Sequence, residues 1–393
     1  MTSNKDLWKE VKEGKTTFIT LNDAERIYDS SVFYNPRMTI NRDLSLVMLE
    51  TIYSFEKKSL VYIDPLAGTG IRGFRILKEL NPDIIELMVI SDKNPKAVEI
   101  IKKNSENVEN KEKLRIQRAD AIDIITQLMQ EKILPDVIDI DPFGSPVQFL
   151  ETSLRALGYK QGYLFATATD LQVLCGRYSD ACFRMYNAHP TRYHLCHEVA
   201  LRILLYNTLV SAGRLGLAIQ PILSLNHEHF LRIKLKILES KEIANVQHIE
   251  QGLVHFCSRC SFFKISKYKE KFDSHQCPIC NTHLETAGPL WLGNLYDKKY
   301  VSVMLEKLEL LNLPSQNQLK KILSIISEEE EIPFFYFIPY MLREIDKTGV
   351  SRLQIIDGLR DKGFNASRTI FDPEGLKTNA SYHDILDVIN NIN

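Results

Sequence analysis

From residue 60 onward, short apolar runs and stretches with helically spaced apolar positions take turns along the chain. The apolar runs are typical of buried strands, because they are brief and each is followed by turn residues. They lie at residues 60–63, 87–91, 114–117, 134–140 and 162–168, and helical stretches at 71–80 and 97–107 separate the first of them. This alternation predicts a doubly wound α/β domain with a mostly parallel sheet.

Two further features complete this predicted domain. A helical stretch at 192–211 is followed by alternating, strand-like runs at 215–222 and 230–237, which predict a closing antiparallel pair. Upstream of the sheet, residues 44–55 have helical spacing, and Asn41 or Asp43 is placed to cap that helix.

After about residue 240 the pattern changes to mixed short elements. Residues 288–293 predict a tight apolar turn, residues 333–340 a strand, and the acidic run 328–331 a solvated linker. Helical patterns lie at 301–311, 316–326, 342–347, 351–362 and 382–392. We therefore expect an N-terminal α/β domain over residues 1–240 and a smaller α+β domain over 241–393.

Acidic residues stand where the predicted strands end, at Asp64, Asp92, Asp120 and Asp141. A single such residue is more often a helix cap. Four of them, separated by helical segments, predict a ligand-binding edge, because open α/β sheets bind ligands outside the carboxyl ends of their strands. Asp92, 28 residues after Asp64, is placed to accept from ribose hydroxyls, and Asp120 could accept from an adenine amine.

The segment Asp141-Pro142-Phe143-Gly144 brings a carboxylate and an aromatic ring to this edge. Such a pair suits an exocyclic amine on a base, because the ring can hold the base and the carboxylate can orient the amine and accept its proton. The alternative is a Pro-Gly turn whose Asp caps the next helix.

Glycines at Gly68 and Gly70 follow the first strand and permit a tight turn close to a ligand. The segment lacks the G-x-G-x-x-G fingerprint and the lysine of a P-loop. This disfavours a phosphate cradle and an NAD-dependent oxidoreductase.

The amino-acid composition narrows the class of protein and its expected location further. The 393 residues are 44% hydrophobic and 25% charged with a net charge of −1, so nucleic-acid binding would need a local basic face. The sequence shows no apolar run of 18 residues and no secretory signal at its N-terminus, so we expect no membrane span and a cytoplasmic location. Seven cysteines, an odd number, indicate a reducing compartment.

Four of those cysteines form two C-x-x-C pairs with 16 residues between them: Cys257, Cys260, Cys277 and Cys280. This spacing predicts a zinc ribbon with a closed tetrahedral, structural site. The basic, aromatic-containing stretch 264–272 between the pairs fits either phosphate contacts or a solvated strand face.

Several of these motifs together resemble the tRNA guanine-N2 dimethyltransferases. The motifs are FYNP at 33–36, NRD at 41–43, DPLAGTGIR at 64–72, DPFGSP at 141–146, GPLW at 288–291 and GLKTNA at 375–380. The resemblance covers nearly the whole chain. It implies a class I, Rossmann-like methyltransferase domain that uses S-adenosylmethionine to place one or two methyl groups on the exocyclic amine of a guanine, typically position 26 of tRNA.

The resemblance also implies residue roles. Asp141 would accept the amine proton, and Phe143 and Phe33 would sandwich the flipped base. Arg42 and Arg72 would approach the methionine portion of the cofactor, with Gly68 and Gly70 in the cofactor loop. Asp92 would bind the ribose, and Asp120 with Ala121 the adenine. The sequence has Gly68 where many members carry another small residue, and Asn379 where Asp is common.

Two alternatives stay open at this point. One is an amino-methyltransferase that acts on DNA or on a protein amide, although those enzymes usually read Pro-Pro-aromatic and here a single proline precedes Phe143. The other is a non-catalytic zinc-ribbon RNA-binding protein, which would bind tRNA without the cofactor.

Overall fold

The computed structural model describes residues 8–23, 30–106, 108–267, 269–270, 272 and 274–392. The chain divides into two compact units, each built from three separate segments. The first unit holds residues 1–167, 234–239 and 299–323, and the second holds residues 168–233, 240–298 and 324–393. The predicted domains, by contrast, are continuous in sequence.

A seven-stranded sheet has the order β5-β4-β3-β6-β7-β9-β8. Its strands are β3 (Leu60–Asp64), β4 (Ile85–Asp92), β5 (Leu114–Arg118), β6 (Val137–Ile140), β7 (Tyr163–Ala168), β8 (Ala218–His227) and β9 (Phe230–Leu238). The pairs β3–β4, β4–β5, β3–β6 and β6–β7 are parallel. The predicted α/β fold with a mostly parallel sheet is thus confirmed.

Strand β6 is shorter than the predicted run 134–140. It begins at Val137 because Pro135 has no N–H for the ladder and because the Asp136 side chain accepts from the Val61 N–H at 2.9 Å. Strands β3, β6 and β7 are buried at every residue, as expected for parallel strands covered on both faces.

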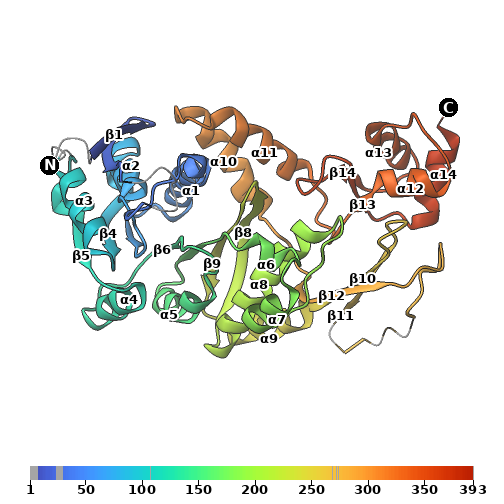
Figure 1. Cartoon of the computed structure of the whole chain (residues 1–393), viewed down its shortest axis with the longest axis horizontal. Helices are drawn as coiled ribbons and strands as arrows, with labels where there is room; N and C mark the ends of the chain where they lie inside the picture. Colours follow the sequence, from blue (N-terminus) through green and yellow to red (C-terminus); the bar gives the residue numbers. More distant parts are fainter. Residues whose placement is uncertain are drawn as a thin grey trace. The chain divides into compact units, whose positions relative to one another are not determined.

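The helices of the first unit include the predicted stretches 44–55, 71–80 and 97–107, which correspond to its first three helices, and two helices that were not predicted individually. They are α1 (Thr39–Glu56), α2 (Ile71–Glu79), α3 (Pro95–Ser105), α4 (Ala121–Gln130) and α5 (Val147–Gly158). Helices α2 and α3 pack against β4 (Figure 1). Gly73 of α2 makes this contact close, since a Cβ there would lie 2.5 Å from a carbon of Ile90.

The predicted cap of α1 is wrong. The helix begins at Thr39, so Asn41 and Asp43 lie inside its first turns and are fully buried. A 3₁₀ turn at Pro36–Met38, capped by the Asn35 side chain, runs directly into the helix and takes over the start.

Two other parts of the chain complete the first unit. An N-terminal antiparallel hairpin, β1 (Trp8–Glu13) and β2 (Thr16–Leu21), brings the buried Glu13. The segment 299–323, which includes most of α10 (Lys298–Leu310), also belongs to the first unit, although it lies far along the chain. The hydroxyls of Tyr300 and Tyr163 lie 3.1 Å apart, and the Ser315 N–H donates to Asp43 at 2.8 Å.

The second unit combines helices with two small sheets, ordered β11-β10-β12 and β13-β15-β14. Its strands are β10 (Gln251–Phe256), β11 (Phe263–Lys267), β12 (Glu285–Trp291), β13 (Tyr336–Phe337), β14 (Ala366–Arg368) and β15 (Gly375–Thr378). Its helices include α6 (Leu171–Leu174), α7 (Ser179–Tyr186), α8 (Cys196–Arg214), α9 (Lys241–Gln247), α12 (Ile338–Glu344), α13 (Arg352–Asp361) and α14 (Tyr382–Asn391), and the residues of α11 (Gln316–Glu328) are divided between the two units.

Two predictions about local elements in this unit are wrong. Most of the predicted turn 288–293 belongs to β12, which pairs with β10 through Gly252 and Leu290. In the predicted strand 333–340, only Tyr336–Phe337 pairs, and α12 begins at Ile338 with Pro339 in its first turn. Proline fits a first helical turn, where its missing N–H is not needed.

The predicted solvated linker at 328–331 is right for the exposed Glu328 and Glu331 but wrong for Glu329. Glu329 is fully buried, with its Oε1 2.9 Å from the Lys377 ammonium and accepting a 2.9 Å hydrogen bond from Thr369. The run of acidic residues alone therefore did not reveal that one of them forms a buried ion pair. Among the described residues, no helix is both long enough and apolar enough to cross a membrane.

Candidate functional site

The four predicted strand-end acids lie at one edge of the sheet. Asp64 and Asp92 are the last residues of β3 and β4, Asp120 follows β5 as the N-cap of α4, and Asp141 directly follows β6. Because these strands are parallel, all four side chains start from the same, carboxyl edge. The strand order reverses between β3 and β6, which is the position where open α/β sheets bind their ligands.

The loop after β3 is tied to the end of β4. Asp92 accepts the Gly68 N–H through one carboxylate oxygen and the Asn94 N–H through the other, each at 2.9 Å. Burial raises the pKa of Asp92, and these N–H groups offset part of that effect. Gly68 and Gly70 have φ of +55° and +76°, which explains glycine at both positions.

Asp120 has the capping role that was its alternative interpretation. Its Oδ1 accepts the Ile122 N–H at 3.0 Å, and this hydrogen bond starts α4. Ala121, the first helical residue, is buried. The cap fixes the Asp120 carboxylate at the sheet edge.

Asp141 is held by Arg72. An Nη2 hydrogen of Arg72 is donated to Asp141 Oδ2, while its Nη1 donates to Asn41 at 3.1 Å and to Ser45 at 3.0 Å. The Arg72 side chain is almost completely buried, whereas that of Asp141 is 18% exposed. The buried side chains of Asn41 and Ser45 therefore hold the Arg72 guanidinium in place, and the guanidinium holds one oxygen of Asp141.

Three carboxylates act on this one guanidinium: Asp141, Asp64 and Asp139, the last with Oδ2 3.4 Å from Arg72 Nη1. Burial raises the pKa of Asp64 to about 7; the Arg72 charge opposes this shift, and the charges of Asp139 and Asp141 add to it. The region around Arg72 thus carries more acidic than basic groups.

Sequence reasoning missed the buried polar residues beneath Asp141. Asp139 of β6 accepts hydrogen bonds from Tyr62 at 2.7 Å and Ser45 at 3.3 Å. Lys234 of β9, buried, donates to Ser45 at 3.2 Å and lies over the Phe165 ring at 3.6 Å. The available signals were the single acid within the apolar strand VIDI and the three alternating basic residues of FLRIKLKIL.

The two predicted base-binding rings are neighbours. Phe33 and Phe143 have centroids 4.4 Å apart and an interplanar angle of 77°, an edge-to-face contact. Phe143 is 67% exposed, and Gly144 after it has φ +81°. A base sandwiched between two parallel rings needs them about 7 Å apart, so the exposed Phe143 would have to turn away from Phe33.

Arg42 is not brought to Asp141. Its Nε donates to Glu13 at 2.7 Å, and its Nη2 donates to the Asn35 carbonyl at 3.0 Å. Burial opposes ionisation of Glu13, but Arg42 and Arg75 outweigh it and lower its pKa to about 2. Tyr34 also donates to Glu13 at 2.9 Å, so this tyrosine is tied to the end of β1.

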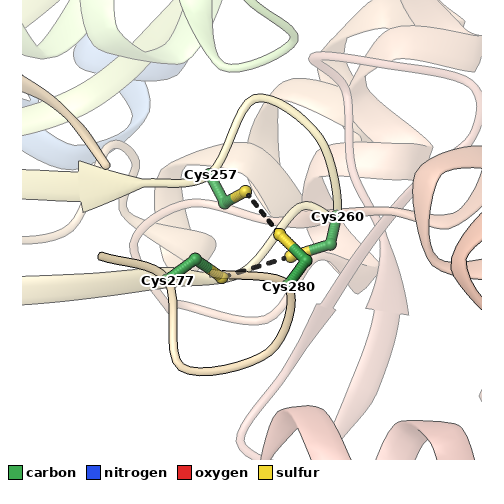
Figure 2. Close-up of side chains that lie close together, drawn as sticks. All are labelled: Cys257, Cys260, Cys277 and Cys280. Carbon is green, nitrogen blue, oxygen red and sulfur yellow. Dashed lines mark hydrogen bonds between the residues drawn. The ribbon is translucent and has the colours of Figure 1, made fainter. Parts of the chain in front are cut away.

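The four predicted metal ligands converge in the second unit (Figure 2). Cys257 Sγ lies 3.4 Å from Cys280 Sγ, and Cys260 Sγ lies 3.5 Å from Cys277 Sγ. A disulfide would need about 2.05 Å, whereas zinc–sulfur bonds of about 2.3 Å in a tetrahedron put the sulfurs about 3.8 Å apart. The donor set and its spacing fit a tetrathiolate metal site.

Neighbouring groups support these thiols without competing for them. The Arg259 N–H points to Cys257 Sγ at 3.4 Å, and the Tyr382 hydroxyl donates to the Cys260 carbonyl at 3.0 Å. His255 has both ring nitrogens engaged, with Thr286 and Ser266 at 2.9 Å each, so its contacts are with hydroxyls.

Comparison with known proteins gives consistent results. A family model described as N2,N2-dimethylguanosine tRNA methyltransferase matches residues 12–390. The tRNA (guanine(26)-N(2))-dimethyltransferase of Pyrococcus horikoshii is 35% identical, over 98% of each chain, and that of Methanobrevibacter smithii is 32% identical, over 97% of each. The solved structure of Pyrococcus horikoshii Trm1 in complex with S-adenosyl-L-methionine matches 97% of this chain and 99% of its own, with 32% identity and a TM-score of 0.84.

The strand order, the acids at the carboxyl edge and these full-length matches agree. The chain belongs to the family of N2,N2-dimethylguanosine tRNA methyltransferases.

Proposed function

We propose that this protein transfers one or two methyl groups from S-adenosylmethionine to the N2 amine of guanine 26 in tRNA, with Asp141 as the catalytic carboxylate. The observation that carries the residue assignment is the position of Asp141 at the strand reversal, fixed by Arg72 and followed by the exposed Phe143. Family membership supports the reaction and the substrate class.

S-adenosylmethionine would be held along the carboxyl edge of the sheet. Asp92 fits the ribose hydroxyls, Asp120 with Ala121 the adenine, and the Gly68–Gly70 turn the close approach of the backbone. When bound, the sulfonium supplies a methyl carbon that already carries a good leaving group. The acidic surplus around Arg72 favours a cationic ligand there.

Arg42 and Arg72 take different parts in this proposal. Arg72 reaches the sheet edge directly and can contact the methionine carboxylate after exchanging part of its bond with Asp141. Arg42, engaged by Glu13, would need to leave that pair to reach the ligand.

Asp141 would act on the guanine amine. The lone pair of this amine is delocalised into the ring, so it is a poor nucleophile. A carboxylate that accepts one N–H favours the more nucleophilic, pyramidal nitrogen and takes the proton as the nitrogen gains the methyl group. The flipped base would be held between Phe33 and Phe143, whose faces offset part of the cost of unstacking.

The four cysteines would hold a structural zinc ion. With four protein ligands the site has no open position, so its role is to tie the two cysteine-bearing turns together. Zinc-bound thiolates fit a reducing, cytoplasmic setting.

The test is a methylation assay with labelled S-adenosylmethionine and an unmodified tRNA transcript, followed by digestion to nucleosides. Label should appear in N2-methylated guanosine and vanish with a transcript carrying adenine at position 26. Asp141→Asn should lower the rate by about 10²- to 10⁴-fold, the usual contribution of a general base, with cofactor binding retained. Asp123→Asn, an exposed acid in α4, is the matched control.

Other outcomes would overturn separate parts of the proposal. If tRNA binds but no guanosine is labelled, the protein is not this methyltransferase. If another nucleoside is labelled, the substrate assignment fails. An Asp141→Asn variant as active as the wild type would leave the reaction intact and remove Asp141 from its role.

A further inference from the structure

A second group of sulfur and nitrogen donors lies in the second unit, apart from the four cysteines. It comprises Cys175, directly after α6, and the first two residues of α8, Cys196 and His197. Their ligand atoms all lie within 4.8 Å of one another, and all three side chains are half-buried. Neither the methyl-transfer site nor the predicted zinc ribbon uses them.

The distances fit a shared metal ion. Cys175 Sγ lies 3.7 Å from His197 Nδ1. Zinc bonded tetrahedrally to a sulfur at about 2.3 Å and a nitrogen at about 2.1 Å puts these two atoms about 3.6 Å apart. Cys175 and His197 therefore already have the spacing of two ligands, and Cys196, within 4.8 Å of both, needs to move by about 1 Å at most.

The local structure also favours ligation. Cys196 is the first residue of a 19-residue helix, where the backbone N–H groups and the helix dipole stabilise a thiolate. Helix α6 packs against α8, which keeps Cys175 beside this helix start.

We propose that Cys175, Cys196 and His197 form a second metal site, which takes a zinc-class divalent ion and joins the segment after β7 to the start of α8. Two thiolates with one imidazole are a donor set that zinc favours. Three protein ligands leave one position for water or another small ligand. The alternative chemistry for this cluster is a disulfide between Cys175 and Cys196.

The test counts zinc in the full-length protein, purified under reducing conditions from zinc-supplemented cells and passed through metal-free buffer. Metal analysis by mass spectrometry should give about one zinc ion fewer per chain for Cys175→Ser and for His197→Ala than for the wild type. Cys182→Ala, which removes a buried cysteine outside the cluster, should keep the wild-type count. Cys280→Ser should lose the other ion, so the two sites are counted independently.

A cobalt titration keeps the proposal testable if a variant folds poorly. Wild-type protein stripped and reloaded with Co²⁺ should show two sets of visible bands, one from a four-sulfur site and one from a site with two sulfurs and a nitrogen. The proposal is overturned if Cys175→Ser and His197→Ala retain the wild-type zinc content. It is equally overturned if the intact wild type lacks two hydrogens that reduction restores, with the linkage mapped to Cys175 and Cys196.

Discussion

The variant Phe143→Ala should impair recognition of the target base and leave the stability of the fold nearly unchanged. The ring is 67% exposed, and its edge-to-face contact with Phe33 is of a kind worth about 0.5–1.5 kcal/mol. Removing the ring should therefore lower the free energy of unfolding by about 1.5 kcal/mol at most. Binding of S-adenosylmethionine, proposed for the ends of β3, β4 and β5, should not change.

Its effect on the tRNA reaction should be much larger. A base stacked on an aromatic side chain gains about 1–3 kcal/mol, which corresponds to about 5- to 150-fold in kcat/KM. Phe143→Trp keeps a flat ring and should retain most of the activity. Single-turnover methylation of a tRNA transcript at several enzyme concentrations gives the value directly.

Tyr159→Ala is the matched control, because Tyr159 is equally exposed, at 66%, and lies at the end of α5. It should leave kcat/KM within about twofold. The reasoning is refuted if Phe143→Ala also leaves kcat/KM unchanged, or if its loss of activity is matched by an equal loss of cofactor binding or of folded protein.

Two further predictions concern stability. Glu329→Gln removes one carboxylate from the buried Lys377, which keeps Glu198 at 3.3 Å, and should cost about 1–3 kcal/mol in urea unfolding, whereas Glu331→Gln in the same acidic run should cost under about 0.5 kcal/mol; equal costs would contradict the buried pair. Asp64 has a pKa raised to about 7 by burial, against 3.8 in the unfolded chain, so the folded state holds its proton more tightly and the stability it contributes in acid is lost as the pH rises from about 4 to 7. Asp64→Asn should therefore gain stability relative to the wild type as the pH rises from about 4 to 7, by about 4 kcal/mol in total; a constant difference over that range would show that the folded state does not raise the pKa of Asp64.

The sheet and its acidic edge were predictable because both follow from local patterns. A parallel strand buried on both faces must be apolar throughout, and the residue after it must stand at the edge, so Asp64, Asp92 and Asp141 could be located from sequence. The four-cysteine cluster was predictable because two C-x-x-C turns have a fixed geometry.

The remaining contacts depend on the tertiary fold. Glu329 pairs with Lys377, 48 positions away, so the acidic run gave no sign that one of its members is buried. Arg42 pairs with Glu13 of a hairpin that the hydrophobic pattern did not indicate. Cys175 meets His197 across 22 positions, a separation far longer than the C-x-x-C spacing that marked the other cluster.

The interleaving of the two units has a consequence for synthesis on the ribosome. The chain passes between the units five times, at residues 167/168, 233/234, 239/240, 298/299 and 323/324. The Tyr163 hydroxyl can bond to Tyr300, and the Asp43 carboxylate to Ser315, only after those later residues have been synthesised. Both follow the last strand of the seven-stranded sheet by about 60 residues or more. The nascent first unit must therefore stay incomplete until most of the polypeptide has left the exit tunnel, and a gene truncated at residue 240 would encode a protein that lacks part of its own first unit.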